Sequence, residues 1–167
     1  EFRNAGNRAR AGVVLASLAA KMGRASDGTV SEQWLLEAIA IHRESGDRAA
    51  EAAAIANLSS IYRKTGRVNE AMTHNEQAIA ILRQLDEPDH LAIVLGNHGN
   101  LHQTLGRPLE AASFIEQSLR ISQASGNLVR QGIALSNLAN IHNDLGDLGR
   151  AEHLCEEALR IVRQVGH

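Results

Sequence analysis

The sequence predicts an all-α protein, a solenoid of antiparallel helix hairpins. Two observations carry this prediction: a repeat of 40 residues and apolar residues spaced as on one face of a helix. There are only two prolines and no β-branched runs, which removes the usual signs of strands. A shift of 40 residues aligns five sets of three: Asn57, Asn97, Asn137; Gly66, Gly106, Gly146; Ala71, Ala111, Ala151; Glu76, Glu116, Glu156; Ile81, Ile121, Ile161.

The repeat divides the chain into four modules, and we expect them to form one domain over residues 7–166. Their predicted bounds are 7–46, 47–86, 87–126 and 127–166. We treat residues 1–6 as a leader, either a cloning remnant or the end of a preceding helix. One hairpin cannot bury both of its flanks, so successive modules must stack on one another.

Each module reads as two helices joined by a short turn. In the second module, Asp47 is a candidate N-cap, and apolar residues follow the helical period over 55–62. Gly66 then ends the first helix, and the second helix runs from about Ala71 to Leu82. The link "SGD" at 45–47 returns as "SGN" at 125–127 and is replaced by "DEPD" at 86–89.

The alanines at 71, 111 and 151 predict the tightest crossing between the helices of a hairpin. A larger side chain there would hold the two backbones apart. A second small set, Ala38, Ser118 and Ala158, lies on the second helices. We expect Ala111→Leu to overpack the hairpin at a cost of about 1–3 kcal/mol, which a melting curve would measure.

Composition excludes several classes of function. The net charge is -2, aromatic residues make up 2%, and Cys155 is the single cysteine. A basic nucleic-acid surface, a base-stacking platform and a disulfide framework are therefore not expected. No apolar run reaches membrane-spanning length and no secretory signal is visible. We expect a cytoplasmic protein without cofactor, nucleic-acid partner or membrane partner.

These motifs resemble the tetratricopeptide repeat, in a variant of about forty residues. "NLSSIYRKTGRVNEA" at 57–71 and "NLANIHNDLGDLGRA" at 137–151 carry the family's leucine, glycine and alanine spacing. "LGNHGNL" at 95–101 is similar to the Leu-Gly-Asn spindle-orientation adaptors, and "AEHLCEEALRI" at 151–161 to kinesin light chain. "SGDRAAEA" is similar to arrays of bacterial signalling ATPases and regulators. The resemblance implies a right-handed superhelix.

The resemblance also implies a concave groove lined by the first helix of each module. Repeated amides there could satisfy the main chain of a bound segment. Alternatively, the asparagines hydrogen-bond a neighbouring helix and are structural. Basic residues near the first modules suggest a ligand with acidic character at that end. The alternative is a solvated face, which is the more common role of exposed charges. The predicted peptide-binding residues are Arg24, Asn57, Ser60, Arg63, Lys64, Asn97, Asn100, Gln103, Asn137, Asn140, Asn143 and Asp144.

The first module departs from the family pattern. Ser17 replaces its groove asparagine, and Ser26 replaces its turn glycine. His98 and His102 lie four residues apart, a spacing that can chelate zinc, but no third ligand lies nearby. We therefore predict no metal site and expect these rings, with His142, to fill an aromatic slot between helices. Their protonation below about pH 6 should then loosen the third and fourth modules.

Two further side chains are expected in the packed interior. Trp34 is repeat-equivalent to Phe114, so packing is favoured over a ligand cage. Cys155 is interpreted as a small buried hydrophobe. No nucleophile–base pair or phosphate loop is found, so we predict no catalytic residue and no enzyme.

Three functions remain open. The first is an adaptor-like scaffold that binds a peptide segment of a partner protein or of another domain of its parent. The second is a ligand-sensing or regulatory fragment of a larger bacterial ATPase or transcriptional regulator. The third is a structural module that assembles end to end with copies of itself.

Overall fold

Helices account for nearly all of the computed structural model, which describes residues 2–22 and 28–165. The described residues form no strand, as the sequence predicts. In chain order the helices are α1 (Phe2–Met22), α2 (Thr29–Ser45), α3 (Arg48–Lys64), α4 (Val68–Leu82), α5 (Pro88–Thr104), α6 (Pro108–Ala124), α7 (Leu128–Asp144) and α8 (Leu148–Val165). Helix α1 begins at Phe2, ahead of the predicted module start at Asn7.

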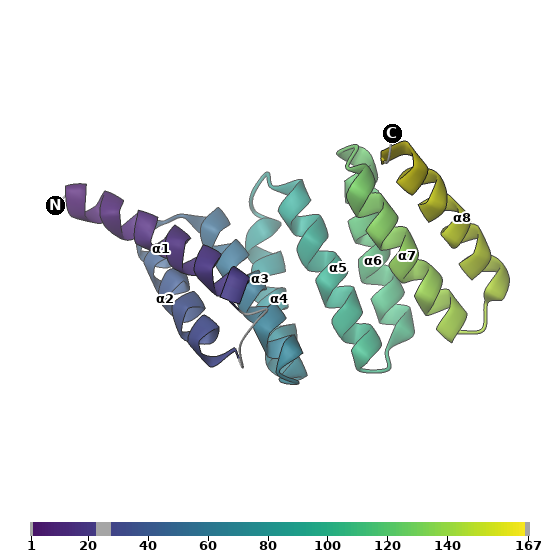
Figure 1. Ribbon diagram of the computed structural model, residues 1–167, viewed down its shortest axis with the longest axis horizontal. Coiled ribbons are helices and arrows are strands. Elements are labelled where there is room, and N and C mark those ends of the chain that lie inside the picture. Colours follow the sequence, from purple (N-terminus) through teal and green to yellow (C-terminus); the bar gives the residue numbers. More distant parts are fainter. Residues whose placement is uncertain (1, 23–27, 166–167) are drawn as a thin grey trace. The chain divides into compact units, whose positions relative to one another are not determined.

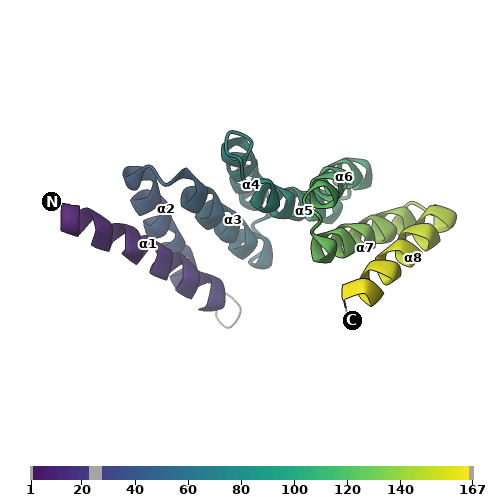
Figure 2. The same cartoon turned by 90° about the horizontal axis from the view of Figure 1, so that it is seen from above.

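The chain divides into two compact units, Glu1–Asp86 and Glu87–His167. The first holds α1 to α4 and the second α5 to α8. In each unit, consecutive helices pack as antiparallel hairpins, and the two hairpins of the unit pack side by side (Figures 1 and 2). This is the predicted α-solenoid of helical hairpins. None of the described helices is both long and apolar enough to cross a membrane.

Glycine ends these helices in the way the sequence predicts. Gly66 has a φ of 77° and Gly106 a φ of 70°, a left-handed conformation that costs glycine little. The next amide then reaches back into the helix: Arg67 N donates to Tyr62 O at 2.8 Å. This is the Schellman pattern, which satisfies carbonyls that the helix leaves open.

Side-chain caps begin α3 and α7, whereas proline begins α5. Asp47 Oδ1 accepts from Ala50 N at 3.1 Å, so the predicted N-cap is confirmed. Asn127 Oδ1 accepts from Arg130 N at 3.2 Å. Pro88 stands at the first position of α5, where its missing N–H has no helical partner to lose.

The predicted small residues pack at the hairpin crossings. Ala71 and Ala111 are fully buried, and Ala151 is nearly so. Opposite Ala71, the Ser59 hydroxyl donates to the Ala71 carbonyl at 2.8 Å. Opposite Ala111, the repeat-equivalent of Ser59 is Gly99. A Cβ built on Gly99 would lie 3.0 Å from the Ala111 carbonyl oxygen, so the backbones touch there.

The core of the second unit closes around these crossings. Its buried cluster includes Ala111 and Ile115 of α6, Leu135 and Leu138 of α7, and Leu154 of α8. Aliphatic side chains from three helices therefore fix how the two hairpins of this unit lie against each other. Helices α5 and α7 also contact each other directly.

Candidate groove on the second unit

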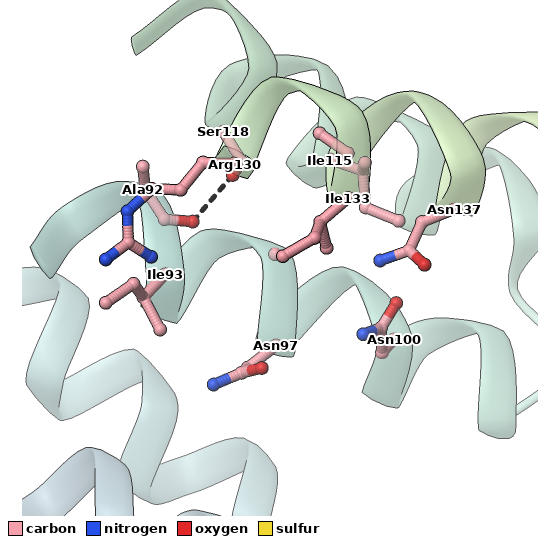
Figure 3. Close-up of a pocket in the computed structure, with 11 residues that line it drawn as sticks. Ala92, Ile93, Asn97, Asn100, Ile115, Ser118, Arg130, Ile133 and Asn137 are labelled. Atoms are coloured by element: carbon pink, nitrogen blue, oxygen red, sulfur yellow. Dashed lines mark hydrogen bonds between the residues drawn. The ribbon is translucent and has the colours of Figure 1, made fainter. Parts of the chain in front are cut away.

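A narrow groove runs between α5 and α7 of the second unit, with α6 as its floor (Figure 3). Its cavity is about 140 Å³. Three predicted asparagines line it: Asn97 and Asn100 from α5, and Asn137 from α7. The amides of Asn100 and Asn137 point toward one another across the groove (Figure 3). The structure thus brings together three residues of the predicted site.

The three amides keep their hydrogen-bonding capacity. Each is half-buried, and none makes a hydrogen bond to another group in the described part of the chain. Each amide carries two donors and a carbonyl acceptor. An asparagine with a structural role would hydrogen-bond a neighbouring helix through its amide. Asn97, Asn100 and Asn137 make no such hydrogen bond in the described chain.

Apolar residues form the rest of the groove, and the sequence analysis missed them. Ile93 of α5 and Ile133 of α7 flank the amides, and Ile115 lies beneath them. Ile93 and Ile133 stand four residues before Asn97 and Asn137, one helical turn back on the same face. The signal for both isoleucines was the same helical period, extended one turn toward the N-terminus from each asparagine.

The floor of the groove is tied together by a buried serine. Ser118 Oγ of α6 donates to the Ala92 carbonyl of α5 at 2.6 Å, drawn as a dashed line in Figure 3. A Cβ on Gly96 would lie 3.5 Å from Ser118 Oγ, an ordinary van der Waals contact. The predicted small residue at 118 therefore holds α6 close under α5.

Arg130 marks one end of the groove and was also missed. Its Nε lies 3.8 Å from Asp89 Oδ1, an ion pair too long for a hydrogen bond. Asp89 is also engaged by Ser125 Oγ and Asn127 Nδ2, each at 3.3 Å. The guanidinium lies near Ile93, at the end of the groove away from Asn100 and Asn137 (Figure 3).

The opposite end of the groove is polar. Gln103 Nε2 of α5 donates to Asp144 Oδ2 of α7 at 2.9 Å, which ties together the last turns of the two helices. Asn140 and Asn143 of α7 are exposed and do not line the cavity.

The first unit carries the remaining predicted residues. On α3, Asn57 is half-buried and makes no hydrogen bond within the described chain, whereas Ser60 Oγ donates to the Ala56 carbonyl at 3.2 Å. Arg63 and Lys64 are exposed at the end of the same helix. Arg24, like Ser26, lies outside the described residues. The acidic character of a ligand at the first modules therefore stays a prediction.

His98 and His102 of α5 point into the protein, as predicted. Only 2% of His98 and 8% of His102 is exposed. The His98 ring meets His102 edge to face at 4.9 Å and Phe114 of α6 at 4.5 Å, and the His102 ring stacks on Phe114 at 5.1 Å. We call these three rings the imidazole cluster. Burial, with a smaller repulsion from His102, lowers the pKa of His98 to about 4.

Three other expectations concern single side chains. Trp34 is half-buried. The interpretation of Cys155 as a buried residue is wrong, because it is exposed on α8. His142 is half-buried rather than enclosed, and its Nδ1 lies 3.4 Å from Asp147 Oδ2. Loosening of the fourth module by acid stays a prediction.

Solved structures share this fold at low sequence identity. Aspartyl phosphate phosphatase F of Bacillus subtilis superposes with a TM-score of 0.90 at 14% identity, over 95% of this chain and 42% of its own. A signal transduction ATPase with numerous domains and a tetratricopeptide repeat sensor, from Pyrococcus horikoshii, gives 0.81 at 18%, over 92% of this chain and 24% of its own. The chain thus spans less than half of either protein.

A kinesin light chain of Podospora anserina with nearly identical repeats gives a TM-score of 0.70 at 19% identity, over 90% of this chain and 76% of its own. A comparison with curated proteins finds no significant match. At these identities the structural likeness concerns the fold alone.

Sequence profiles identify the repeats directly. Two profiles, both described as tetratricopeptide repeat, match residues 11–84 and 51–124 in one case and 133–165 in the other. Repeats of this kind are generally scaffolds for protein interactions and not catalytic modules. Since the matches cover most of its length, the chain belongs to the tetratricopeptide repeat family.

Proposed function

We propose that the groove between α5 and α7 binds an extended segment of a partner protein, or of another domain of the parent protein. The carrying observation is the set of three amides, Asn97, Asn100 and Asn137, whose donors and acceptors are unused at the groove surface. An extended peptide has unpaired main-chain N–H and C=O groups, and side-chain amides match both. The protein then acts as an adaptor-like scaffold.

The dimensions of the groove support recognition of one side chain at a time. Its cavity of about 140 Å³ is well below the ~300–1,000 Å³ of pockets that enclose a small-molecule ligand. Ile93 and Ile133 give it apolar walls. A single aliphatic side chain of the bound segment would fill it, while the peptide main chain lies across the amides.

The two ends of the groove differ in charge, which favours one orientation of the bound segment. Arg130 and the first turns of α5 and α7 place positive charge at one end. Asp144 and the last turns of the same helices place negative charge at the other. An acidic residue of the ligand would lie beside Arg130, although Asp89 offsets part of that attraction.

Selection of peptides against the chain tests this proposal. Peptides are selected from a random display library and their dissociation constants measured for the wild type, Asn97→Ala and Asn137→Ala. Each variant should weaken binding about tenfold or more, because removal of an amide leaves main-chain groups of the peptide unpaired. Asn69 of α4 is exposed and lies outside the groove, so Asn69→Ala is the matched control and should bind as the wild type does.

Melting temperatures separate recognition from folding in the same experiment. The asparagine variants should melt close to the wild type, since their amides make no hydrogen bond in the described chain. Selected peptides that bind all variants equally would refute the groove as the binding site. Unfolding of Asn97→Ala or Asn137→Ala would show that the amides are structural.

A second candidate is a sensor segment of a larger signalling protein. The observation behind it is the fold shared with the repeat sensor of the Pyrococcus horikoshii ATPase, of which this chain covers 24%. In that case the same groove would report ligand occupancy to a nucleotide-binding domain of the parent. The parent coding sequence decides this: a nucleotide-binding or DNA-binding domain favours the sensor, and the lack of one opposes it.

A further inference from the structure

Helix α5 carries two glycines in its interior, and packing explains only one of them. A Cβ built on Gly99 would lie 2.5 Å from Ile115 Cγ1, so no larger residue fits there. Outside α5, the described atom nearest to a Cβ on Gly96 is Ser118 Oγ at 3.5 Å, so alanine fits at this position. Glycine inside a helix lowers the stability of the helix relative to alanine. Gly96 therefore weakens α5 without a reason in the packing.

The repeat does not require glycine at this position either. The repeat-equivalents of Gly96 are Ala16, Ala56 and Ser136. In α7 the Ser136 hydroxyl donates to the Gly132 carbonyl of its own helix at 2.9 Å, so a side chain is accommodated there. Position 96 alone of the four lacks a side chain, and the glycine is thus a feature of the third module.

Gly96 borders the cavity of the groove between α5 and α7, together with Ile115 and Ser118. The side chain that a Cβ on Gly96 would meet is that of Ser118, which belongs to the floor of the same groove. A methyl group at 96 would thus lie at the cavity wall and take up part of a volume of about 140 Å³. The lack of a side chain at 96 keeps that volume open to a ligand.

The open volume matches one side chain of medium size. An apolar cavity of about 150 Å³ takes up one benzene molecule, and the groove offers about 140 Å³. Ile93 and Ile133 supply its apolar walls, and Ile115 lies beneath them. A leucine side chain would fill this space, whereas valine or alanine would leave part of it empty. Empty space beside a bound apolar side chain forfeits van der Waals contacts.

The amides of the groove cannot select one peptide sequence over another. Asn97, Asn100 and Asn137 offer donors and acceptors to main-chain groups, which are the same for almost every residue of a peptide. A preference for one side chain therefore has to come from the residues around the cavity. Gly96 determines how much room those residues leave.

Resting on the proposed binding of an extended segment, we propose that Gly96 makes the groove prefer a leucine-sized aliphatic side chain. That side chain enters between Ile93 and Ile133 and lies over Gly96. The amides of Asn100 and Asn137, which face one another across the groove, hold the main chain beside it (Figure 3). Gly96 is thus a specificity-determining residue, and a methyl group at 96 shifts the preference toward smaller side chains.

Dissociation constants for a pair of matched peptides test this inference. Peptides are selected on the wild type from a random display library, and the residue whose replacement by alanine weakens binding most is taken as the anchor. The anchor is then made leucine or valine, and both peptides are titrated calorimetrically against the wild type and Gly96→Ala. The wild type should prefer the leucine peptide about tenfold, the effect of one methylene in an apolar pocket. Gly96→Ala should abolish this preference.

Gly132→Ala is the matched control for the change in helix stability. Gly132 lies inside α7, and a Cβ there would lie 3.6 Å from Ile161 Cγ2, outside the lining of the cavity. Both substitutions replace a helix-interior glycine and favour the helix to a similar extent. The control should therefore keep the leucine preference of the wild type.

A wild type without a leucine preference overturns the inference, as does an unchanged preference in Gly96→Ala or an equal loss in Gly132→Ala. The proposed function survives these outcomes if Asn97→Ala and Asn137→Ala still weaken binding of the same peptides. Peptides that bind both asparagine variants as tightly as the wild type refute the proposed function and this inference with it. A library that yields no peptide does the same.

Discussion

The hairpins α3–α4 and α5–α6 fill the same repeat positions with exchanged rings. In the first unit Tyr62 of α3 meets His74 of α4 edge to face at 5.0 Å. In the second unit the repeat-equivalent of Tyr62 is His102, and that of His74 is Phe114, with rings stacked at 5.1 Å. The contact between helices is kept, but the imidazole has moved from the second helix to the first.

The exchange changes the chemistry around the rings. Arg67 lies over the Tyr62 ring at 4.0 Å and pairs with Glu32, whose carboxylate also accepts from the Tyr62 hydroxyl at 3.0 Å. The first ring pair therefore opens onto a charged network. In the second unit His98 stands where the first unit has Leu58, and the imidazole cluster to which it belongs is largely buried. The same contact between two rings is thus joined to charged side chains in the first unit and to a buried histidine in the second.

The largest expected effect comes from the hairpin crossing, where Ser59 and Gly99 are repeat-equivalent. Gly99→Ser should destabilise the second unit by about 3 kcal/mol, because its Cβ would lie 2.5 Å from Ile115 Cγ1. Urea denaturation measures the free energy of unfolding. Ala139→Ser at the same position of the next hairpin is the matched comparison. A Gly99→Ser variant as stable as the wild type would contradict the close approach.

Acid should weaken the second unit through His98. The neutral ring is favoured in the folded state, so its stabilisation is complete above the ordinary histidine pKa of about 6.5 and is lost as pH falls toward about 4. Between pH 7 and pH 4.5 the expected loss from this residue is about 2 kcal/mol. His98→Leu, which installs the residue found at positions 58 and 138, should remove this part of the pH dependence. An unchanged profile would exclude His98 as its source.

A smaller effect is expected at Ser59 itself. Ser59→Ala removes the hydrogen bond to the Ala71 carbonyl and should cost about 1 kcal/mol in the free energy of unfolding. Because this hydrogen bond is buried, water cannot fully replace the serine hydroxyl as the donor to the Ala71 carbonyl. Ser113 of α6 is exposed, so Ser113→Ala provides the comparison and should be neutral. Equal losses for both variants would argue that the Ser59 bond contributes nothing.

The smallest change in stability is expected for Tyr62, whose hydroxyl donates to the Glu32 carboxylate. Tyr62→Phe keeps the ring contacts with His74 and Arg67 but deletes the hydroxyl that donates to Glu32. The expected loss is about 0.5 kcal/mol, because Glu32 keeps Arg67 as a partner. Thermal unfolding of Tyr62→Phe and Tyr62→Leu separates the hydroxyl from the ring. The leucine variant should lose clearly more.

The fold could be predicted from the sequence because several repeated positions each indicate the same helix boundaries and helix contacts. Glycine stops, the Asp47 cap and the buried alanines were each confirmed by local geometry. The candidate site was less predictable. Periodicity put Asn97 and Asn137 at equivalent positions of two helices. It did not show which other side chains line the space between those helices, so Arg130 and Ile133 were missed.

Two residues show why the remainder needed coordinates. Gly99 lies within a helix, where a glycine ordinarily only lowers helix stability, and its role depends on the Ala111 carbonyl of the next helix. Cys155 is exposed on α8, whereas its repeat-equivalents Leu35, Asn75 and Ile115 are buried. The residue type alone does not distinguish the exposed position from the buried ones.

The two prolines of the chain, Pro88 and Pro108, begin the paired helices α5 and α6. Proline fixes φ near its helical value, so the chain loses less conformational entropy on folding at the first residues of α5 and α6 than at other helix starts. Contacts within a hairpin are also short in sequence, which speeds their formation. We therefore expect α5–α6 to nucleate the second unit and to retain its amide protons longest during hydrogen exchange.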